Sequence, residues 1–221
     1  RVYAESGFNR CSIGLQSVQD DLLKQIGRIH TFKEFEEGFS AARNAGFKNI
    51  NIDVMSALPG QTMESWEDTL EKVIALEPEH ISAYSLIIED GTPIEKEYSK
   101  GLLDIPNEDT DREMYMHTFD FLGKNGFKQY EISNFARTGQ ECRHNLGYWD
   151  RVEYLGIGAG ASSLLRNRRF SHIRNRKTYI EAIHEKQPIE TEEELRKVLE
   201  LGADLLQGFF LARPSEVPKA V

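Results

Sequence analysis

Cysteine is scarce in this sequence of 221 residues, where Cys11 and Cys142 are the only two. Two distant thiols form no disulfide framework, and they cannot supply the three or four thiolates of a cysteine-rich metal site. Long apolar runs are absent too, since none reaches the roughly 18 to 20 residues of a membrane span. Basic charge is in deficit: 27 Lys and Arg stand against 36 Asp and Glu, which gives a net charge of −9. We therefore expect no nucleic-acid partner, because binding phosphates requires a net basic face.

The start of the chain also lacks features. The sequence begins at Arg1 and not at a methionine, and its first residues match neither a signal peptide nor a transit peptide. An apolar, strand-like run follows after only a few residues. We expect a chain that begins in the middle of a fold, with enough residues to bury a core.

The first half repeats a strand-then-helix unit. Strand-like runs at residues 11–15, 50–55 and 81–88 alternate with helix signals at 19–27, 31–46 and from Thr62 to Pro78. Thr31 and Glu34 form a capping box at the start of one helix, and Gly46 ends it. This rhythm predicts a parallel α/β sheet, either open and doubly wound or closed as a barrel.

The second half predicts a mixed α+β segment. A charged loop at 104–111 precedes a helix that ends at Asn125 and Gly126. Residues 127–135 predict a short strand, and the Gly-rich residues 155–163 predict a strand or turn. Helices are expected at about 176–186 and 192–207, followed by a frayed tail at 211–221.

Ligands of parallel α/β folds bind at the carboxyl ends of the strands. Gln16 and Ser17 end the first strand, residues 84–89 close the third, and Asp53 lies within the apolar second strand. An unpaired buried carboxylate costs several kcal/mol, so Asp53 requires a partner or a cleft. A structural hydrogen bond and a functional role both satisfy this requirement.

Two further segments leave alternatives open. Arg28, between two helices, is either a solvated surface residue or a guanidinium that binds a carboxylate through two hydrogen bonds. For the neighbouring His30 we favour a role as a helix-capping residue. The loop at residues 58–62 is either a turn or a set of backbone N–H donors for an anion.

The stretch CRHNLGYW at residues 142–149 gathers His144, Asn145, Tyr148 and Trp149 within six residues. An imidazole can bind a metal or haem iron, and aromatic side chains can pack on a flat ring. The alternative is an aromatic-rich turn that caps the core, with His144 bonded locally.

Four strings carry a resemblance to a known family. NRCSIGLQS at 9–17, NIDVMSALPGQT at 51–62 and PEHISAYSL at 78–86 closely resemble radical S-adenosylmethionine (SAM) proteins of the coproporphyrinogen dehydrogenase group. The HNxxYW motif at residues 144–149 narrows the resemblance to the haem-chaperone branch, HemW. The resemblance covers about residues 5 to 190.

The resemblance implies cofactor contacts at defined positions. Gln16, Arg28 and Asp53, at the family's spacings of twelve and twenty-five residues, are implied to contact SAM. Arg28 would pair with the methionyl carboxylate, and Ile87 would line the same cleft. His144, Asn145, Tyr148 and Trp149 are implied to bind haem, with His144 as the haem contact.

The resemblance also implies fold, partners and location. The fold would be part of the open (β/α)6 TIM-like barrel of radical SAM proteins with an α+β extension. Residues 1–100 would be the later part of the barrel, 101–175 a post-barrel segment with the HNxxYW motif, and 176–221 a helical segment leading to a truncated C-terminal domain. Haem is the implied cargo, delivered to respiratory proteins with peripheral membrane contact, in the cytoplasm.

The sequence departs from the family in two respects. The Cys-x3-Cys-x2-Cys loop, which binds the [4Fe–4S] cluster in the intact protein, and the Gly-rich SAM loop are expected upstream of Arg1. Ser162 stands where relatives usually carry histidine. Two functions stay open, a haem chaperone and an oxygen-independent coproporphyrinogen III dehydrogenase that performs oxidative decarboxylation to protoporphyrinogen IX. The fragment itself is expected to be inactive.

Overall fold

The computed structural model describes residues 2–188, 190 and 191. The chain divides into two compact units, the first ending at Glu141 and the second beginning at Cys142. Each unit is built from its own segment of sequence and is described by itself.

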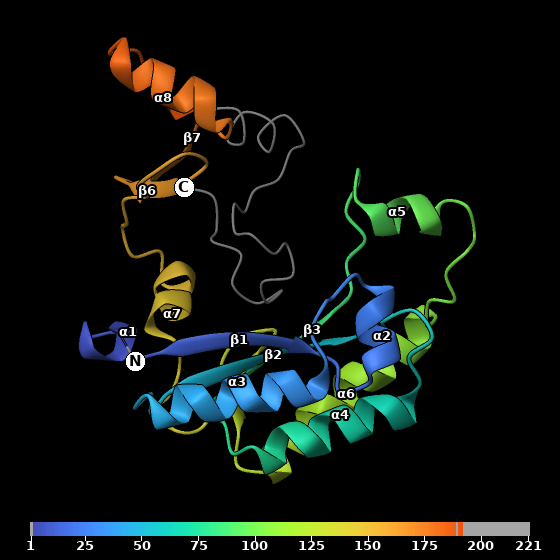
Figure 1. The fold of residues 1–221 in the computed structure, drawn as a ribbon. Coiled ribbons are helices and arrows are strands. Elements are labelled where there is room, and N and C mark those ends of the chain that lie inside the picture. The colour runs from blue at the N-terminus through green and yellow to red at the C-terminus, as the bar shows by residue number, and fades with distance from the viewer. Residues whose placement is uncertain (1, 189, 192–221) are drawn as a thin grey trace, which may run out of the picture. The chain divides into compact units, whose positions relative to one another are not determined.

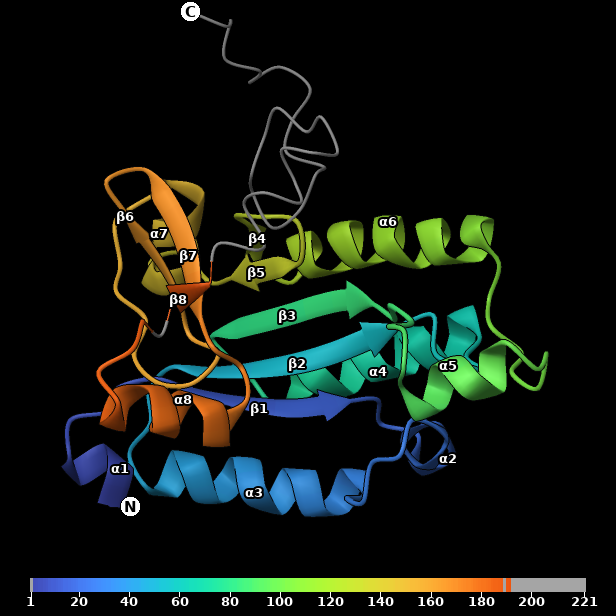
Figure 2. The same ribbon diagram turned by 90° about the horizontal axis from the view of Figure 1, so that it is seen from above.

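The first unit is built on a five-stranded sheet. Strands β1 (Cys11–Gln16), β2 (Ile50–Ser56) and β3 (His80–Ser85) are parallel, as their spacing with intervening helices predicts, and they lie side by side in Figure 2. Strands β5 (Asn134–Ala136) and β4 (Lys128–Gln129) extend the sheet in the order β1-β2-β3-β5-β4. Both added pairings are antiparallel, so the parallel series stops at β3.

Two predicted strands differ in extent. The expected strand at residues 127–135 is a hairpin, because the Glu131 carboxylate accepts hydrogen bonds from the Ser133 backbone N–H (2.8 Å) and from the Asn134 amide, which holds a turn between β4 and β5. The third strand, expected to reach residue 88, ends at Ser85. Beyond it, the Leu86 N–H still donates to the Ser56 carbonyl oxygen at 2.9 Å before the chain leaves the sheet.

Three long helices cover one face of β1, β2 and β3 (Figure 1). They are α3 (Phe32–Asn44), α4 (Met63–Ala75) and α6 (Glu108–Lys124). The predicted capping box of Thr31 and Glu34 is present at the start of α3, and Thr62 and Ser65 form another at α4. The shorter helices are α1 (Val2–Glu5), α2 (Asp20–Gln25) and α5 (Pro93–Tyr98).

The core lies between this sheet face and the three helices. Trp66 of α4 is almost fully buried, and its indole N–H donates to Thr118 Oγ1 of α6 at 2.9 Å. Alternate strand residues complete the core, namely Leu15, Ile50, Ile52, Val54, Ile81 and Ala83. The helix-covered face is therefore committed to packing, and the opposite face of the sheet is left for polar side chains.

The second unit begins with helix α7 (Arg143–Trp149). It continues with strands β6 (Ser162–Leu165) and β7 (Arg168–His172), helix α8 (Arg176–His184) and strand β8 (Glu190–Thr191). The three strands form an antiparallel sheet in the order β6-β7-β8. Residues 142–149 are thus a short helix rather than a turn. At residues 155–163, where a strand or turn was expected, the structure has a turn at 158–160 and strand β6 from Ser162. The helix expected at 192–207 and the tail at 211–221 lie outside the described residues.

Candidate functional site

A polar stripe crosses the sheet face opposite the helices. Successive side chains of a strand point to opposite faces, so the residues that alternate with the buried Leu15, Ile52 and Ile81 share this second face. The stripe consists of Ser12, Gly14 and Gln16 from β1, Asn51, Asp53 and Met55 from β2, and His80, Ser82 and Tyr84 from β3. Gln16 and Asp53, two of the expected SAM contacts, therefore lie on one face of the sheet, where Asp53 is partly exposed and Gln16 is buried.

Gln16 ends β1 in a left-handed backbone conformation, with φ of 73°. The register shifts between Gly14, which stands opposite Asp53, and Gln16, which stands opposite Val54. An unbroken register would place Gln16 opposite Met55, so the irregularity brings Gln16 one residue nearer to Asp53. Left-handed residues other than glycine cost about 1–3 kcal/mol and persist where the surroundings hold them.

His30 supplies part of that support. Its ring nitrogen Nε2 lies 3.2 Å from the Leu15 carbonyl oxygen, to which it donates as an N–H. Leu15 is fully buried and immediately precedes Gln16. His30 thus hydrogen-bonds the end of strand β1, whereas the sequence predicted that it would cap a helix.

Gly14 leaves open the space that Gln16 and Arg28 use. A Cβ at Gly14 would stand 2.9 Å from Gln16 Nε2 and 3.9 Å from Arg28 Nη2. Within the described part of the chain, no carboxylate pairs with the exposed Arg28 guanidinium. A guanidinium held beside the stripe without an internal counter-charge can bind a ligand carboxylate through two parallel hydrogen bonds.

Asp53 has partners within the sheet. Asn51 Nδ2 donates to Asp53 Oδ1 at 2.6 Å, and Ser12 Oγ donates to Asp53 Oδ2 at 3.3 Å. The side chain is only partly buried, so oxygen lone pairs stay available to a ligand. The anomaly of a carboxylate in an apolar strand is thereby explained, because Asp53 is both hydrogen-bonded and accessible.

Tyr84 joins this group from β3. Its hydroxyl donates to Gln16 Oε1 at 3.4 Å. Burial raises the pKa of the Tyr84 phenol, and the charge of Asp53 raises it further, whereas the Gln16 hydrogen bond and the Arg28 charge lower it. Tyr84 is thus hydrogen-bonded to Gln16 and lies within electrostatic range of Asp53 and Arg28, so all three expected SAM contacts surround this one phenol.

Ile87, the fourth expected SAM contact, lies outside the polar stripe. It follows the end of β3 by two residues and is 66% exposed.

The loop at residues 58–62 is a turn whose backbone N–H donors are already used. Gln61 Oε1 accepts from the Leu58 N–H at 3.1 Å, and the Asp104 carbonyl accepts from the Gly60 N–H at 2.7 Å. This loop does not present free N–H groups to an anion.

Sequence reasoning missed the residues behind Asp53. His80 is fully buried, and its Nδ1 lies 2.6 Å from Asn51 Oδ1 while its Nε2 lies 2.7 Å from the Tyr130 hydroxyl. Burial, with a smaller effect from the positive charge of Arg10, lowers the pKa of His80 to about 3. The signal was present in the sequence as polar residues two apart in each strand, which share one face.

The HNxxYW motif forms most of α7 in the second unit. The His144 ring meets Tyr148 edge to face with centroids 4.5 Å apart, and Tyr148 meets Tyr154 at 4.9 Å. His144 is exposed, and among the described residues no hydrogen bond to its ring nitrogens is formed. Asn145 and Trp149 are partly buried on the same short helix. The motif therefore presents an accessible imidazole held by aromatic neighbours.

Ser162 opens β6, at the position where the family resemblance leads us to expect histidine. Its hydroxyl lies 2.9 Å from that of Ser171, its cross-strand partner on β7. Ser162 thus has a structural partner within its own sheet.

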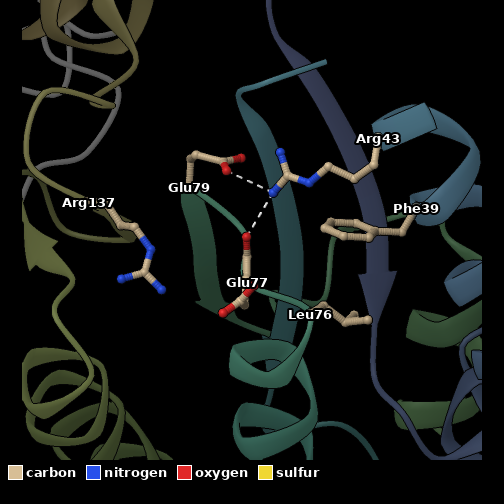
Figure 3. A pocket seen from close by; sticks show the side chains of 6 residues that line it. All are labelled: Phe39, Arg43, Leu76, Glu77, Glu79 and Arg137. Atoms are coloured by element: carbon tan, nitrogen blue, oxygen red, sulfur yellow. Dashed lines mark hydrogen bonds and ion pairs between the residues drawn. The ribbon is translucent and has the colours of Figure 1, made fainter. Parts of the chain in front are cut away.

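A groove at the amino ends of the strands has a structural explanation (Figure 3). Its cavity volume is about 620 Å³, and it is lined by Phe39, Arg43, Leu76, Glu77, Glu79 and Arg137. The Arg43 guanidinium binds the Glu79 carboxylate and the Glu77 carbonyl oxygen, each at 2.8 Å. Glu79 also accepts from the Ile50 N–H at 2.9 Å. These groups satisfy one another and tie the end of α3 to the starts of β2 and β3.

Two kinds of feature, clusters of metal ligands and membrane-spanning helices, are absent from residues 2–188, 190 and 191. No group of three or more His, Cys, Asp or Glu side chains among them is arranged to hold a metal ion. None of the helices formed by these residues is both long and apolar enough to cross a bilayer.

Known proteins resemble this chain in sequence. The profile of the radical SAM superfamily matches residues 1–73. The haem chaperone HemW of Lactococcus lactis is 41% identical over 208 residues, which cover 94% of this chain and 55% of the relative. HemW of Bacillus subtilis is 39% identical over 223 residues, which cover 98% of this chain and 59% of the relative. The chain thus spans little more than half the length of these relatives.

A solved structure shows the fold. The structure of the radical SAM enzyme coproporphyrinogen III oxidase, HemN, from Escherichia coli matches 85% of this chain and 46% of its own, with a TM-score of 0.68 and 22% identity. The parallel strands of the first unit are accordingly part of a radical SAM TIM-like barrel, followed by an α+β extension, as expected. Together, the superfamily profile, the HemW relatives and this fold identify the chain as a HemW-like member of the radical SAM superfamily.

Proposed function

We propose that the chain carries the SAM-contacting and haem-contacting residues of a haem chaperone of the radical SAM superfamily. The observation that supports this function best is the accessible His144 imidazole, held edge to face by Tyr148 within the HNxxYW motif. The grouping of Gln16, Arg28 and Asp53 around Tyr84, on one face of the sheet, supports the SAM site. The HemW names of the relatives, which span more than this chain, support haem as the cargo.

The polar stripe fits SAM by the chemistry of its groups. Asp53 accepts hydrogen bonds, the Gln16 amide both donates and accepts, and Arg28 offers a forked cation, which suits the hydroxyl, amine and carboxylate groups of SAM. The lack of a side chain at Gly14 lets Gln16 Nε2 and Arg28 Nη2 lie close to β1, next to Asp53. Ile87 would add an apolar contact at the rim. Bound SAM would supply a sulfonium group, which these residues would bind and orient.

The described residues do not fit an iron–sulfur cluster. Cys11 and Cys142 are single thiols in different units, and burial raises the pKa of Cys11, which disfavours the thiolate that iron requires. We therefore derive no step through a cluster. The cluster expected of the intact protein belongs to residues other than these.

Haem is the proposed cargo, bound by His144, Asn145, Tyr148 and Trp149. An exposed imidazole can ligate haem iron, and aromatic rings can pack against the porphyrin. Delivery to respiratory proteins, with peripheral membrane contact and a cytoplasmic location, belongs to the same proposal.

Haem titration into this chain tests the proposal. Haemin is added to the unaltered chain and to His144→Ala, and binding is followed by the Soret absorbance. We expect a spectral shift and saturation that His144→Ala weakens at least tenfold. His184→Ala, which removes an exposed histidine from α8, is the matched control and should bind as the unaltered chain does. Equal binding by His144→Ala would contradict the role of His144, and conversion of coproporphyrinogen III by the full-length relative with SAM and reductant would favour the enzyme instead.

A further inference from the structure

A continuous chain of hydrogen bonds lies behind the Asp53 carboxylate. It runs from the Tyr130 hydroxyl to His80, from His80 to Asn51, and from Asn51 to Asp53, over distances of 2.7, 2.6 and 2.6 Å. Asn51 and His80 are buried, whereas Asp53 is partly accessible. This series of hydrogen bonds therefore connects an accessible carboxylate to the interior of the first unit.

The chemistry of each group fixes the direction of every donor. An ionised carboxylate only accepts, so Asn51 must turn its Nδ2 amide group toward Asp53 Oδ1. The same amide group donates to Ser12 Oγ at 2.7 Å, and this serine donates in turn to Asp53 Oδ2. A flipped amide would set the Asn51 oxygen against the Asp53 carboxylate, which is repulsive.

The orientation of Asn51 sets the tautomer of His80. With Asn51 Oδ1 facing the ring, His80 must donate from Nδ1–H, and Nε2 must accept from the Tyr130 hydroxyl. Because the lowered pKa keeps His80 neutral, the ring has one donor and one acceptor, and both are used. Ser82 Oγ lies 3.1 Å from Asn51 Oδ1 and 2.7 Å from Asn134 Oδ1, so its single proton reinforces the network on one side or the other.

We propose that Asn51 and His80 are positioning residues for SAM: the amide of Asn51 orients the Asp53 carboxylate, and the buried His80 ring holds that amide in its donating orientation. The inference rests on the proposed SAM site. Without His80, the Asn51 amide can rotate, and Asp53 loses a charge-assisted hydrogen bond that fixes its oxygens before the ligand arrives.

The experiment measures binding of S-adenosylhomocysteine to the full 221-residue chain by calorimetry. His80→Leu removes the donor at Nδ1, whereas His80→Asn keeps an amide N–H at the same distance from the backbone. We expect affinity to fall about tenfold in His80→Leu and to return to within about threefold in His80→Asn. His117→Leu is the matched control, because it replaces a half-buried histidine on α6, away from the stripe, and should leave affinity unchanged.

Two further measurements separate positioning from folding. A double-mutant cycle with Asn51→Ala and Asp53→Asn should be non-additive, because Asn51 acts through Asp53. Nitrogen-15 NMR spectra of the chain labelled at histidine should show His80 as the neutral Nδ1–H tautomer. This measurement needs neither a ligand nor a substitution. The Nε2–H tautomer, or His80→Leu binding as tightly as the unaltered chain, would overturn the inference and leave the SAM site standing. No binding by the unaltered chain, or equal binding by Asp53→Asn, would overturn the SAM site and this inference with it.

Discussion

The Tyr84 hydroxyl reaches Gln16 Oε1 at 3.4 Å although β2 lies between their strands. Neighbouring strands are about 4.8 Å apart, so the strands of this pair are separated by roughly twice that distance. The contact forms because the left-handed Gln16 and the long Tyr84 side chain lean toward each other over β2. By register Gln16 stands opposite Val54 and Tyr84 opposite Met55, so the two side chains form an edge of the proposed SAM site just beyond Asp53.

Arg28 should matter for ligand binding far more than for stability. Because its guanidinium has no carboxylate partner among the described residues, Arg28→Ala should change the free energy of unfolding by less than about 0.5 kcal/mol. Loss of a bidentate contact to the ligand carboxylate should weaken S-adenosylhomocysteine binding roughly tenfold or more. Calorimetry and urea unfolding measure the two effects. Arg112→Ala, which breaks an exposed pair with Asp109, is the control and should leave binding unchanged.

Gly14→Ala should impair binding through Gln16. The added methyl would stand 2.9 Å from Gln16 Nε2, so the amide must move away from its place beside Tyr84. We expect several-fold weaker binding of S-adenosylhomocysteine, measured by calorimetry. Gly38→Ala is the control: the position lies in α3 with open space around it, and the change should stabilise the chain by about 0.5–1 kcal/mol. Unchanged affinity in Gly14→Ala would argue that Gln16 does not contact the ligand.

His80 should make stability depend on acidity. Its pKa is about 3 in the folded chain and has its ordinary value of about 6.5 in the unfolded chain. Between these values the unfolded chain binds more protons, so the free energy of unfolding falls as pH decreases from about 6.5, by at most about 1.4 kcal/mol per unit. Above about pH 7 this contribution is constant.

Urea unfolding at pH 7.5 and pH 5 measures the effect. His80→Asn cannot titrate in this range, so the unaltered chain should lose about 1–2 kcal/mol more than the variant does between the two values. Parallel pH profiles for the two chains would show that His80 is not the group responsible.

Tyr148 should act on haem binding through its ring. Tyr148→Ala removes the edge-to-face contact that holds His144, and pairs of this kind contribute about 0.5–1.5 kcal/mol. Haem affinity from a Soret titration should therefore fall roughly two- to tenfold. Tyr148→Phe preserves the ring and should bind within about twofold of the unaltered chain. If the Phe variant lost as much affinity as the Ala variant, the hydroxyl and not the ring would carry the role.

Local patterns predicted much of the first unit. The strands at 50–55 and 11–15 and the capping box of Thr31 and Glu34 follow from apolar periodicity and side-chain chemistry, and the structure confirms them. Helix α7 was missed because its signals are absent: its N-cap residue Cys142 forms no side-chain cap, and its first turn carries no acidic residue. Gly147 further lowers the helix propensity of this stretch.

The arrangement of the candidate site could not be predicted from the sequence, because it depends on how the strands pair. The position of Gln16 depends on a shift in register between β1 and β2, which no local pattern encodes. The partnership of Asn51 with His80 joins residues 29 apart that become neighbours only when the strands pair. The family resemblance supplied Gln16, Arg28 and Asp53, but not the groups that hold Asp53 in place.

The alternation of polar and apolar residues in β2 has a consequence for how this gene can vary. A substitution alters one side chain, whereas deletion of a single residue between Ile50 and Asp53 would invert every later side chain of the strand. Val54 would then enter the polar stripe, and Asp53 would turn toward the packed helices. We therefore expect the number of residues in β2 to vary less among related sequences than the identity of those residues. Insertions and deletions should fall in the loops between strands and helices.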